Sequence, residues 1–104
     1  MKIHWSDYAL NALIKTSDYI TEEFGNSARR KFITAVRKTN SLIKNQPKIG
    51  RVEPLLKDAA LEFRSARVTD INRIIYYIGS SEIEIVDFWD ARRDPEKQAE
   101  RLLK

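Results

Sequence analysis

The spacing of hydrophobic residues changes once along this 104-residue chain, and that change constrains the fold more than any other feature. Up to residue 46, apolar side chains recur at steps of three and four, as they do on one face of a helix. Between residues 61 and 89 they alternate with polar residues or run together as β-branched and aromatic residues, which is typical of strands. A chain of this length forms one domain. We therefore expect an α+β fold in which helices and a sheet share a core.

The first half of the chain predicts one short strand and then two helices. Residues 2–5 alternate in polarity, and Ser6 or Asp7 is suited to cap a helix that runs to about residue 24. Gly25 lies where a left-handed C-terminal cap is expected, and the second helix follows it up to Pro47. The two apolar stripes comprise Ala9, Leu13, Thr16, Ile20 and Phe24, and Ala28, Phe32, Ala35, Thr39 and Leu42.

The second half predicts a loop and three strands. Residues 47–60 show no clean period, and strand-like runs follow at residues 61–68, 72–78 and 83–89. The turns between these runs are short, which favours antiparallel pairing. Pro95 is suited to begin a short C-terminal helix. The expected order is β-α-α-β-β-β, a mostly antiparallel sheet packed against a helical hairpin, with core residues that include Ile20, Phe24, Phe32, Leu42, Ile74 and Ile85.

Composition restricts the classes of site and the compartment. The chain has no Cys, which excludes disulfides, thiolate zinc sites and Cys nucleophiles and suits a reducing cytoplasm. No apolar run approaches the roughly 20 residues of a membrane span, and the first residues lack the apolar core of a signal peptide. We therefore expect a cytoplasmic protein without a membrane partner, and no cofactor or metal site is predicted.

The positive charge is concentrated in the predicted second helix. The formal charge is +4, and the whole surplus lies within residues 1–46. Residues 26–46 contain no acid, and their bases are Arg29, Arg30, Lys31, Arg37, Lys38 and Lys44. Such a stretch attracts polyanions or an acidic protein, although it is also compatible with an ordinary solvated helix face.

Four segments in the order of these elements resemble toxins of the RelE/ParE superfamily. The first segment, residues 47–51, lies in the predicted loop. The next two, residues 63–68 and 72–78, lie in the first two strands after that loop. The fourth, residues 83–95, covers the last predicted strand and the basic segment that follows it. The resemblance implies a single toxin domain over residues 1–104, neutralised by a cognate antitoxin of a type II toxin–antitoxin pair. It also implies one of two targets, because RelE-like toxins cleave mRNA on the ribosome whereas ParE-like toxins poison DNA gyrase.

The resemblance also indicates candidate site residues. Arg64, Arg73, and Arg92 or Arg93 match basic positions of RelE-like toxins, whose chemistry needs fixed cations beside a phosphoryl group that gains charge. Arg suits this task because its guanidinium holds phosphate through two hydrogen bonds. Arg64 and Arg73 are also compatible with ion pairs across neighbouring strands. If the arginines instead bind phosphate as in RelE-like toxins, all four are expected at one edge of the sheet.

The acid and base residues of RelE-like enzymes look incomplete, which leaves enzymatic activity open. Ala66 replaces a second basic residue, the only His is His4 on the first strand, and residues 96–104 contain no Tyr. A carboxylate (Asp87, Asp90 or Glu53) is available instead, but neighbouring arginines would lower its pKa and weaken it as a base.

These departures, together with the long helical hairpin, favour gyrase poisoning. Ribosome-dependent mRNA cleavage is the first alternative. A degenerate, non-toxic module that binds an antitoxin or RNA is the second. Trp89 is compatible with stacking on a nucleobase, but a position at the rim of the core, under an arginine, is the simpler interpretation.

Overall fold

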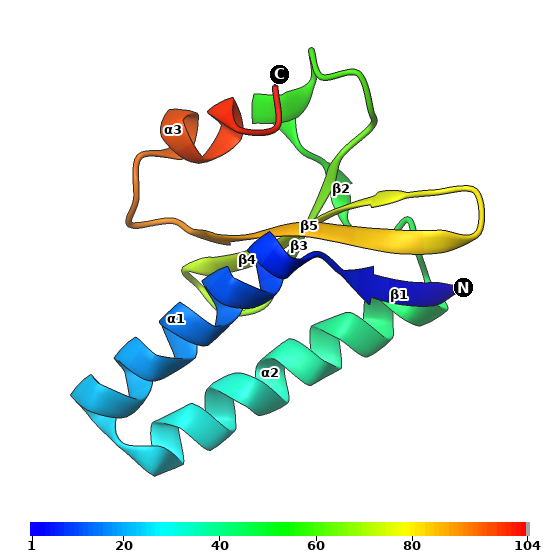
Figure 1. The fold of residues 1–104 in the computed structure, drawn as a ribbon. Helices are drawn as coiled ribbons and strands as arrows, with labels where there is room; N and C mark the ends of the chain where they lie inside the picture. The colour runs from blue at the N-terminus through cyan, green and yellow to red at the C-terminus, as the bar shows by residue number, and fades with distance from the viewer. Residues whose placement is uncertain (104) are drawn as a thin grey trace.

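A computed structural model describes residues 1–103 of the chain as an α+β domain. The helical hairpin and the sheet predicted from the sequence are both present (Figure 1). In chain order the elements are β1 (Lys2–Trp5), α1 (Asp7–Phe24), α2 (Asn26–Asn45), β2 (Arg51–Val52), the 3-10 helix η1 (Pro54–Leu56), β3 (Arg64–Arg67), β4 (Asn72–Ile78), β5 (Glu82–Asp90) and α3 (Pro95–Glu100).

The sheet has five strands in the order β1-β5-β4-β3-β2. The pairs β2–β3, β3–β4 and β4–β5 are antiparallel, as the short turns predict, whereas β1 pairs with β5 in parallel. The two helices of the hairpin separate β1 from the rest of the sheet in sequence, and this long connection permits the parallel pairing. The register between β4 and β5 skips Val86, which makes a β-bulge.

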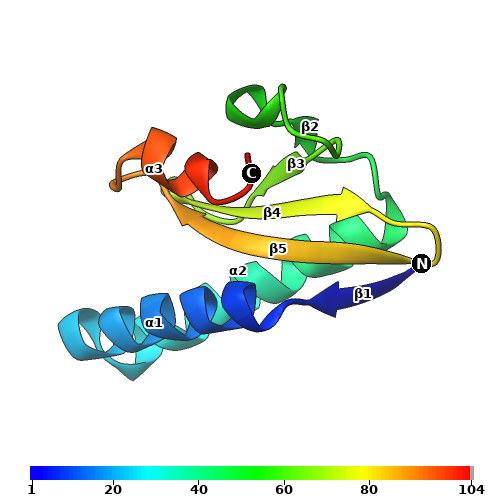
Figure 2. The same ribbon diagram turned by 45° about the horizontal axis from the view of Figure 1, so that its top comes forward.

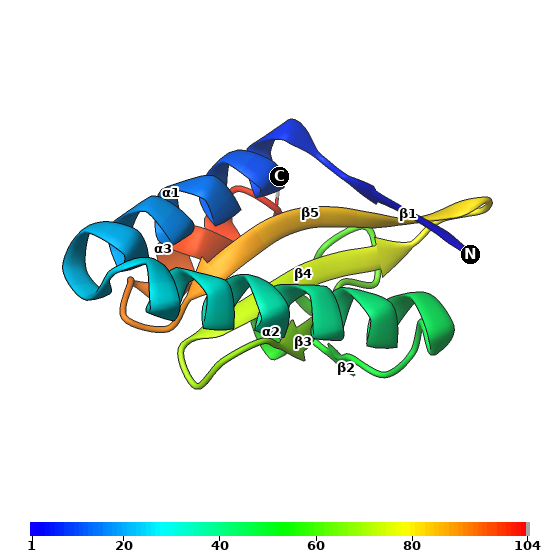
Figure 3. The same cartoon turned by 90° about the horizontal axis from the view of Figure 1, so that it is seen from below.

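Each face of the sheet has its own apolar cluster. The α1–α2 hairpin covers one face, while η1 and α3 cover part of the other (Figures 1 and 3). The first cluster includes Phe32, Ile74 and Ile85, and the second includes Leu56, Ile75 and Trp89. Neighbouring residues of β4 therefore serve opposite cores, as a pleated strand buried on both faces requires.

The ends of the first helix follow from its sequence. The Ser6 hydroxyl accepts a hydrogen bond from the Ala9 amide at 3.1 Å, which caps α1. Gly25 separates the two helices with φ 89° and ψ 178°. The prediction of a left-handed helical cap is therefore wrong in detail, although this extended conformation at positive φ also favours glycine.

Two of the six expected core residues are exposed. Phe32, Ile74 and Ile85 are buried, and Ile20 packs against the first cluster. Phe24 is 67% exposed because the hairpin turn lies beyond the end of the sheet (Figure 2), where its ring lies edge-on to that of Tyr19. Leu42 is 40% exposed because the buried stripe of α2 is rotated slightly from the predicted one and runs through Phe32, Val36, Thr39 and Ile43.

The connection between the hairpin and the sheet has more regular structure than its sequence predicts. Residues 51–52 form the edge strand β2, and η1 follows at residues 54–56, where a loop was expected. Conversely, the strand predicted over residues 61–68 is regular only from Arg64 to Arg67. A two-residue strand has no detectable period, and its existence depends on the neighbouring β3.

Candidate functional site

The four candidate arginines do not share one edge of the sheet. Arg64 lies on the hairpin face, in register with Tyr76, and donates hydrogen bonds to the Gly50 carbonyl at 2.8 Å and to the Glu62 carboxylate at 3.0 Å. Its side chain is only 14% exposed. These contacts fasten β3 to the loop that precedes β2, and the expected convergence of all four arginines at one edge of the sheet is wrong.

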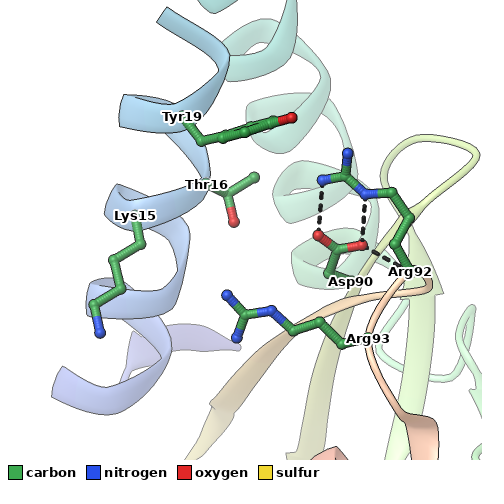
Figure 4. A pocket seen from close by; sticks show the side chains of 6 residues that line it. All are labelled: Lys15, Thr16, Tyr19, Asp90, Arg92 and Arg93. Atoms are coloured by element: carbon green, nitrogen blue, oxygen red, sulfur yellow. Dashed lines mark hydrogen bonds and ion pairs between the residues drawn. The ribbon is translucent and has the colours of Figure 1, made fainter. Parts of the chain in front are cut away.

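Arg92 and Arg93 do come together, at a cleft of about 410 Å³ between α1 and the end of β5. We call this the α1–β5 cleft. Figure 4 shows that residues from one face of α1 lie opposite residues from the end of β5 and the segment that follows it. The lining residues are Lys15, Thr16, Tyr19, Asp90, Arg92 and Arg93.

Asp90 holds one of the two arginines in place. Arg92 donates from Nε and Nη2 to the two oxygens of Asp90, at 3.1 and 2.9 Å, and its backbone amide also donates to Asp90. The hydrogen bonds from Arg92 hold the pKa of the Asp90 carboxyl below its ordinary value. The Arg92 guanidinium lies 5.4 Å from the centre of the Tyr19 ring, within the range of a cation–π contact.

The other two cations of the cleft are available to a ligand. Within residues 1–103, no carboxylate forms an ion pair with Lys15 or Arg93, and both residues are exposed. The Arg93 side chain points toward α1 (Figure 4). The α1–β5 cleft therefore carries two uncompensated positive charges beside one neutralised pair, an arrangement suited to an anionic partner.

Arg73 lies on the opposite face of the sheet, between Arg67 and Trp89 in register. It lines a second cavity of about 340 Å³, which we call the β4 groove. The groove also contains Arg51, Glu53 and Ile71, and its lining is largely apolar. Arg73 has no carboxylate partner among the residues that the structure describes, whereas the neighbouring Arg67 is paired with Asp70.

The three carboxylates proposed as substitute bases are all engaged in hydrogen bonds. Glu53 is 3% exposed and caps η1 by accepting from the Leu55 amide at 3.0 Å. Asp87 is buried and accepts from the Phe88 amide at 2.8 Å and the Trp89 indole at 3.0 Å. Asp90 is bound by Arg92. Each carboxylate therefore has a structural role. The single histidine, His4 on β1, pairs with Glu84 on β5.

Comparison with known proteins decides the family. The sequence profile described as "ParE toxin of type II toxin-antitoxin system, parDE" matches residues 3–95, which is most of the chain. The chain belongs to this ParE toxin family. No curated protein with significant sequence similarity is found.

Solved structures confirm the RelE/ParE-like fold of this ParE-family chain. A structure titled "Chromosomal ParDE TA system from P. aeruginosa" has TM-score 0.63 and 16% identity, and the match covers 86% of this chain and 95% of that one. A "YoeB/ParE toxin from Agrobacterium tumefaciens" has TM-score 0.59 and 19% identity over 86% and 98% of the two chains. "The structure of YoeB dimer from Staphylococcus aureus" has TM-score 0.57 and 17% identity over 86% and 94%.

Membership of the ParE toxin family makes the chain a type II toxin, and a toxin of this type has a cognate antitoxin as its partner. None of the helices in the described part of the chain combines the length and apolar character that crossing a bilayer requires.

Sequence reasoning missed several charged residues of the ParE-family chain that matter for its sites. Lys15 and Arg51 contribute to the two cavities from elements not considered as sources of site residues. Arg101 donates to the carbonyl of the bulged Val86, lies 3.4 Å from Asp87 and stacks 3.5 Å from the Tyr8 ring centre. Trp89 is buried within the second cluster and not at the rim of the core, and the cation–π pairs involve Tyr8 and Tyr19 instead. One signal in the sequence could have pointed to the α1–β5 cleft. Lys15 and Tyr19 are four residues apart, a spacing that places both on the same face of the predicted helix.

Proposed function

We propose that the chain is a growth-inhibiting toxin that poisons DNA gyrase. The profile that matches most of the chain is that of ParE toxins, and the candidate site offers charged binding surface without a free base. Action on gyrase would place the protein in the cytoplasm, as its composition predicts.

The observation that carries the proposal is the engagement of Glu53, Asp87 and Asp90. Cleavage of RNA through a ribose 2′-hydroxyl benefits from a base within hydrogen-bond reach of that hydroxyl. Asp90 has a lowered pKa, which makes it a weaker base, while Glu53 and Asp87 are buried in contacts with the backbone or an indole. Recruiting any of them would break a structural contact.

Lys15 and Arg93 have the role of anchoring the target in this proposal. Unpaired exposed cations attract an acidic surface from a distance and then form charge-assisted hydrogen bonds with its carboxylates or phosphates. Because Arg93 lies on the segment between β5 and α3, its position depends on how this segment is held. The hydrogen bonds between Arg92 and Asp90 fix the start of this segment, and the Arg92 guanidinium contacts the Tyr19 ring of α1.

A second candidate function, mRNA cleavage, is favoured by the composition of the β4 groove. Arg51 and Arg73 face this groove together with Glu53, so phosphate-binding cations and a carboxylate share one cavity. The Arg51 guanidinium lies 3.9 Å from Glu53. If the carboxylate were released from η1 on binding RNA, the groove would contain both a cation and a base.

Induction of the chain in a bacterial host distinguishes the two functions. We expect growth arrest with covalent gyrase–DNA complexes and no new mRNA 5′ ends. New 5′ ends that disappear in Glu53→Gln and Arg73→Ala, without gyrase complexes, would replace the proposal with ribosome-dependent cleavage. Absence of growth arrest, with the protein folded and expressed, would instead support the degenerate module.

The antitoxin is tested separately. The acid-free stretch of α2 and the α1–β5 cleft offer basic surface, and the β4 groove offers a largely apolar lining, to an acidic or amphipathic segment that folds as it binds. We expect the product of a small adjacent gene to bind tightly and to abolish growth arrest when co-expressed. Failure of any adjacent small protein to bind at micromolar concentration would argue against a functioning pair.

A further inference from the structure

The uncovered part of the sheet at β1 and β5 carries a cluster that the toxin function does not use. His4 on β1 and Glu82 and Glu84 on β5 each offer one ligand atom, and these three atoms lie within 4.8 Å of one another. The His4 Nδ1 atom is 2.7 Å from the Glu84 carboxylate. The cluster is far along β5 from Arg92 and Arg93, which follow the other end of that strand.

The strand register brings these side chains together. His4 is the direct partner of Glu84, and Lys2 is the partner of Glu82, in the parallel pairing of β1 with β5. Paired strands lie about 4.8 Å apart, and side chains two residues apart on a strand share one face. His4 therefore lies opposite one carboxylate and diagonal to the other, while Ile3 and Trp5 point to the core on the opposite face.

The two carboxylates are not neutralised by lysine or arginine. Among residues 1–103, neither Glu82 nor Glu84 forms an ion pair with either type of side chain, although Lys2 faces Glu82 in register. The cluster keeps a net negative charge even when the imidazole is protonated. His4 is 58% exposed at its side chain, so a cation from solution has access.

We propose that His4, Glu82 and Glu84 form a binding site for a divalent transition metal, with zinc as the best match. One imidazole and two carboxylates are ligands that Zn²⁺ accepts, and water completes its tetrahedral shell. Donor atoms around such an ion lie about 3.3 Å apart for bonds of roughly 2.0–2.1 Å, so the exposed His4 and the partly buried Glu82 and Glu84 need to move only slightly. Mg²⁺ prefers oxygen donors in octahedral geometry and suits the imidazole poorly.

Metal binding would join the edge strand β1 to β5. β1 has four residues and, within residues 1–103, pairs with β5 alone, so this one pairing holds it in the sheet. Bound metal stabilises whichever state contains the complete ligand set, and that set is assembled only when the two strands are paired. The site is therefore expected to raise the thermal stability of the domain, independently of the target that the toxin inhibits.

The test is a calorimetric titration of the tag-free protein with ZnCl₂, and with MgCl₂ for comparison. We expect one Zn²⁺ per chain, a higher Tm with zinc, and no binding of Mg²⁺ in the same range. His4→Asn should weaken zinc binding by more than about tenfold. Loss of a residue that only supports a metal ligand already weakens binding by about tenfold or more, and His4 is a ligand itself. Glu82→Gln should also weaken it, whereas Glu22→Gln, which removes an exposed carboxylate of α1, should not.

A second measurement keeps the proposal falsifiable if a variant folds poorly. The chain has a single His, so imidazole resonances in a ¹⁵N NMR spectrum of the wild type report on His4 alone. We expect these resonances to shift on addition of zinc and to saturate at one equivalent. Unchanged resonances, absence of binding below millimolar zinc, or equal affinity in wild type and His4→Asn would each overturn the proposal. None of these results bears on growth arrest, so the gyrase proposal stands or falls separately.

Discussion

The hydroxyl of Tyr76, on the central strand β4, donates a hydrogen bond to the Pro47 carbonyl at 2.7 Å and thereby fixes the end of the helical hairpin to the sheet. The same oxygen accepts from the Gly50 amide at 2.9 Å. Burial of the side chain raises the pKa of the Tyr76 hydroxyl, so it remains a neutral donor at physiological pH. A Cβ on residue 50 would lie 2.6 Å from this hydroxyl, which explains glycine there.

Tyr76→Phe should therefore lower the free energy of unfolding by about 1–3 kcal/mol, because it leaves the Pro47 carbonyl and the Gly50 amide without their partner. Denaturant unfolding at neutral pH measures the change. Tyr77→Phe is the matched control, since no hydrogen bond of the Tyr77 hydroxyl occurs among the described residues. Equal stability of the two variants would contradict the proposed role of Tyr76.

Arg64→Ala should reduce stability while leaving the toxin's target contacts intact. Arg64 is largely buried and donates to the Gly50 carbonyl, so its removal costs on the order of 1–3 kcal/mol. Thermal unfolding measures the loss, and Arg51→Ala, on the exposed edge strand β2, is a control with a smaller expected effect. If Arg64→Ala folds as well as wild type yet loses toxicity, Arg64 belongs to the functional surface after all.

Stability should fall in acid partly because of Asp90. The hydrogen bonds from Arg92 lower the pKa of Asp90 in the folded state relative to the unfolded chain. The resulting stabilisation is complete above the unfolded pKa of about 3.9 and is lost as pH falls through the folded value. Asp90→Asn should be less stable than wild type at pH 7, and the difference should shrink toward pH 2. A difference independent of pH would exclude this carboxylate as the cause.

Arg93→Ala should weaken growth inhibition more than Arg73→Ala if the target is gyrase. Arg93 is exposed in the α1–β5 cleft, and loss of one anchoring cation at an interface costs about 1.4 kcal/mol, which is roughly a tenfold loss of affinity. The inducer concentration that arrests growth measures the effect, with Lys57→Ala as a control for charge on the other sheet face. The reverse order of effects would favour a function in the β4 groove.

The helical hairpin and the three antiparallel strands were predictable because their signals are local. Apolar spacing marks α1 and α2, Ser6 and Gly25 mark helix ends, and dense β-formers mark β4 and β5. The ordered segments also sufficed to indicate the RelE/ParE superfamily, which the profile match and the shared fold confirm. Burial near the turn between α1 and α2 was less predictable. Phe24 has the spacing of the apolar stripe on α1, but it lies beyond the end of the sheet and is exposed.

What the sequence by itself determined was the set of elements, their order and the basic residues available. Only the tertiary structure decided how these residues combine, because strand register and bulges assign each side chain to a face. Register places Arg64 on the hairpin face and Arg73 on the other, although both were matched to one family site. The parallel pairing of β1 with β5 brings His4 to Glu84 across 80 positions of sequence, a separation at which no local spacing rule operates.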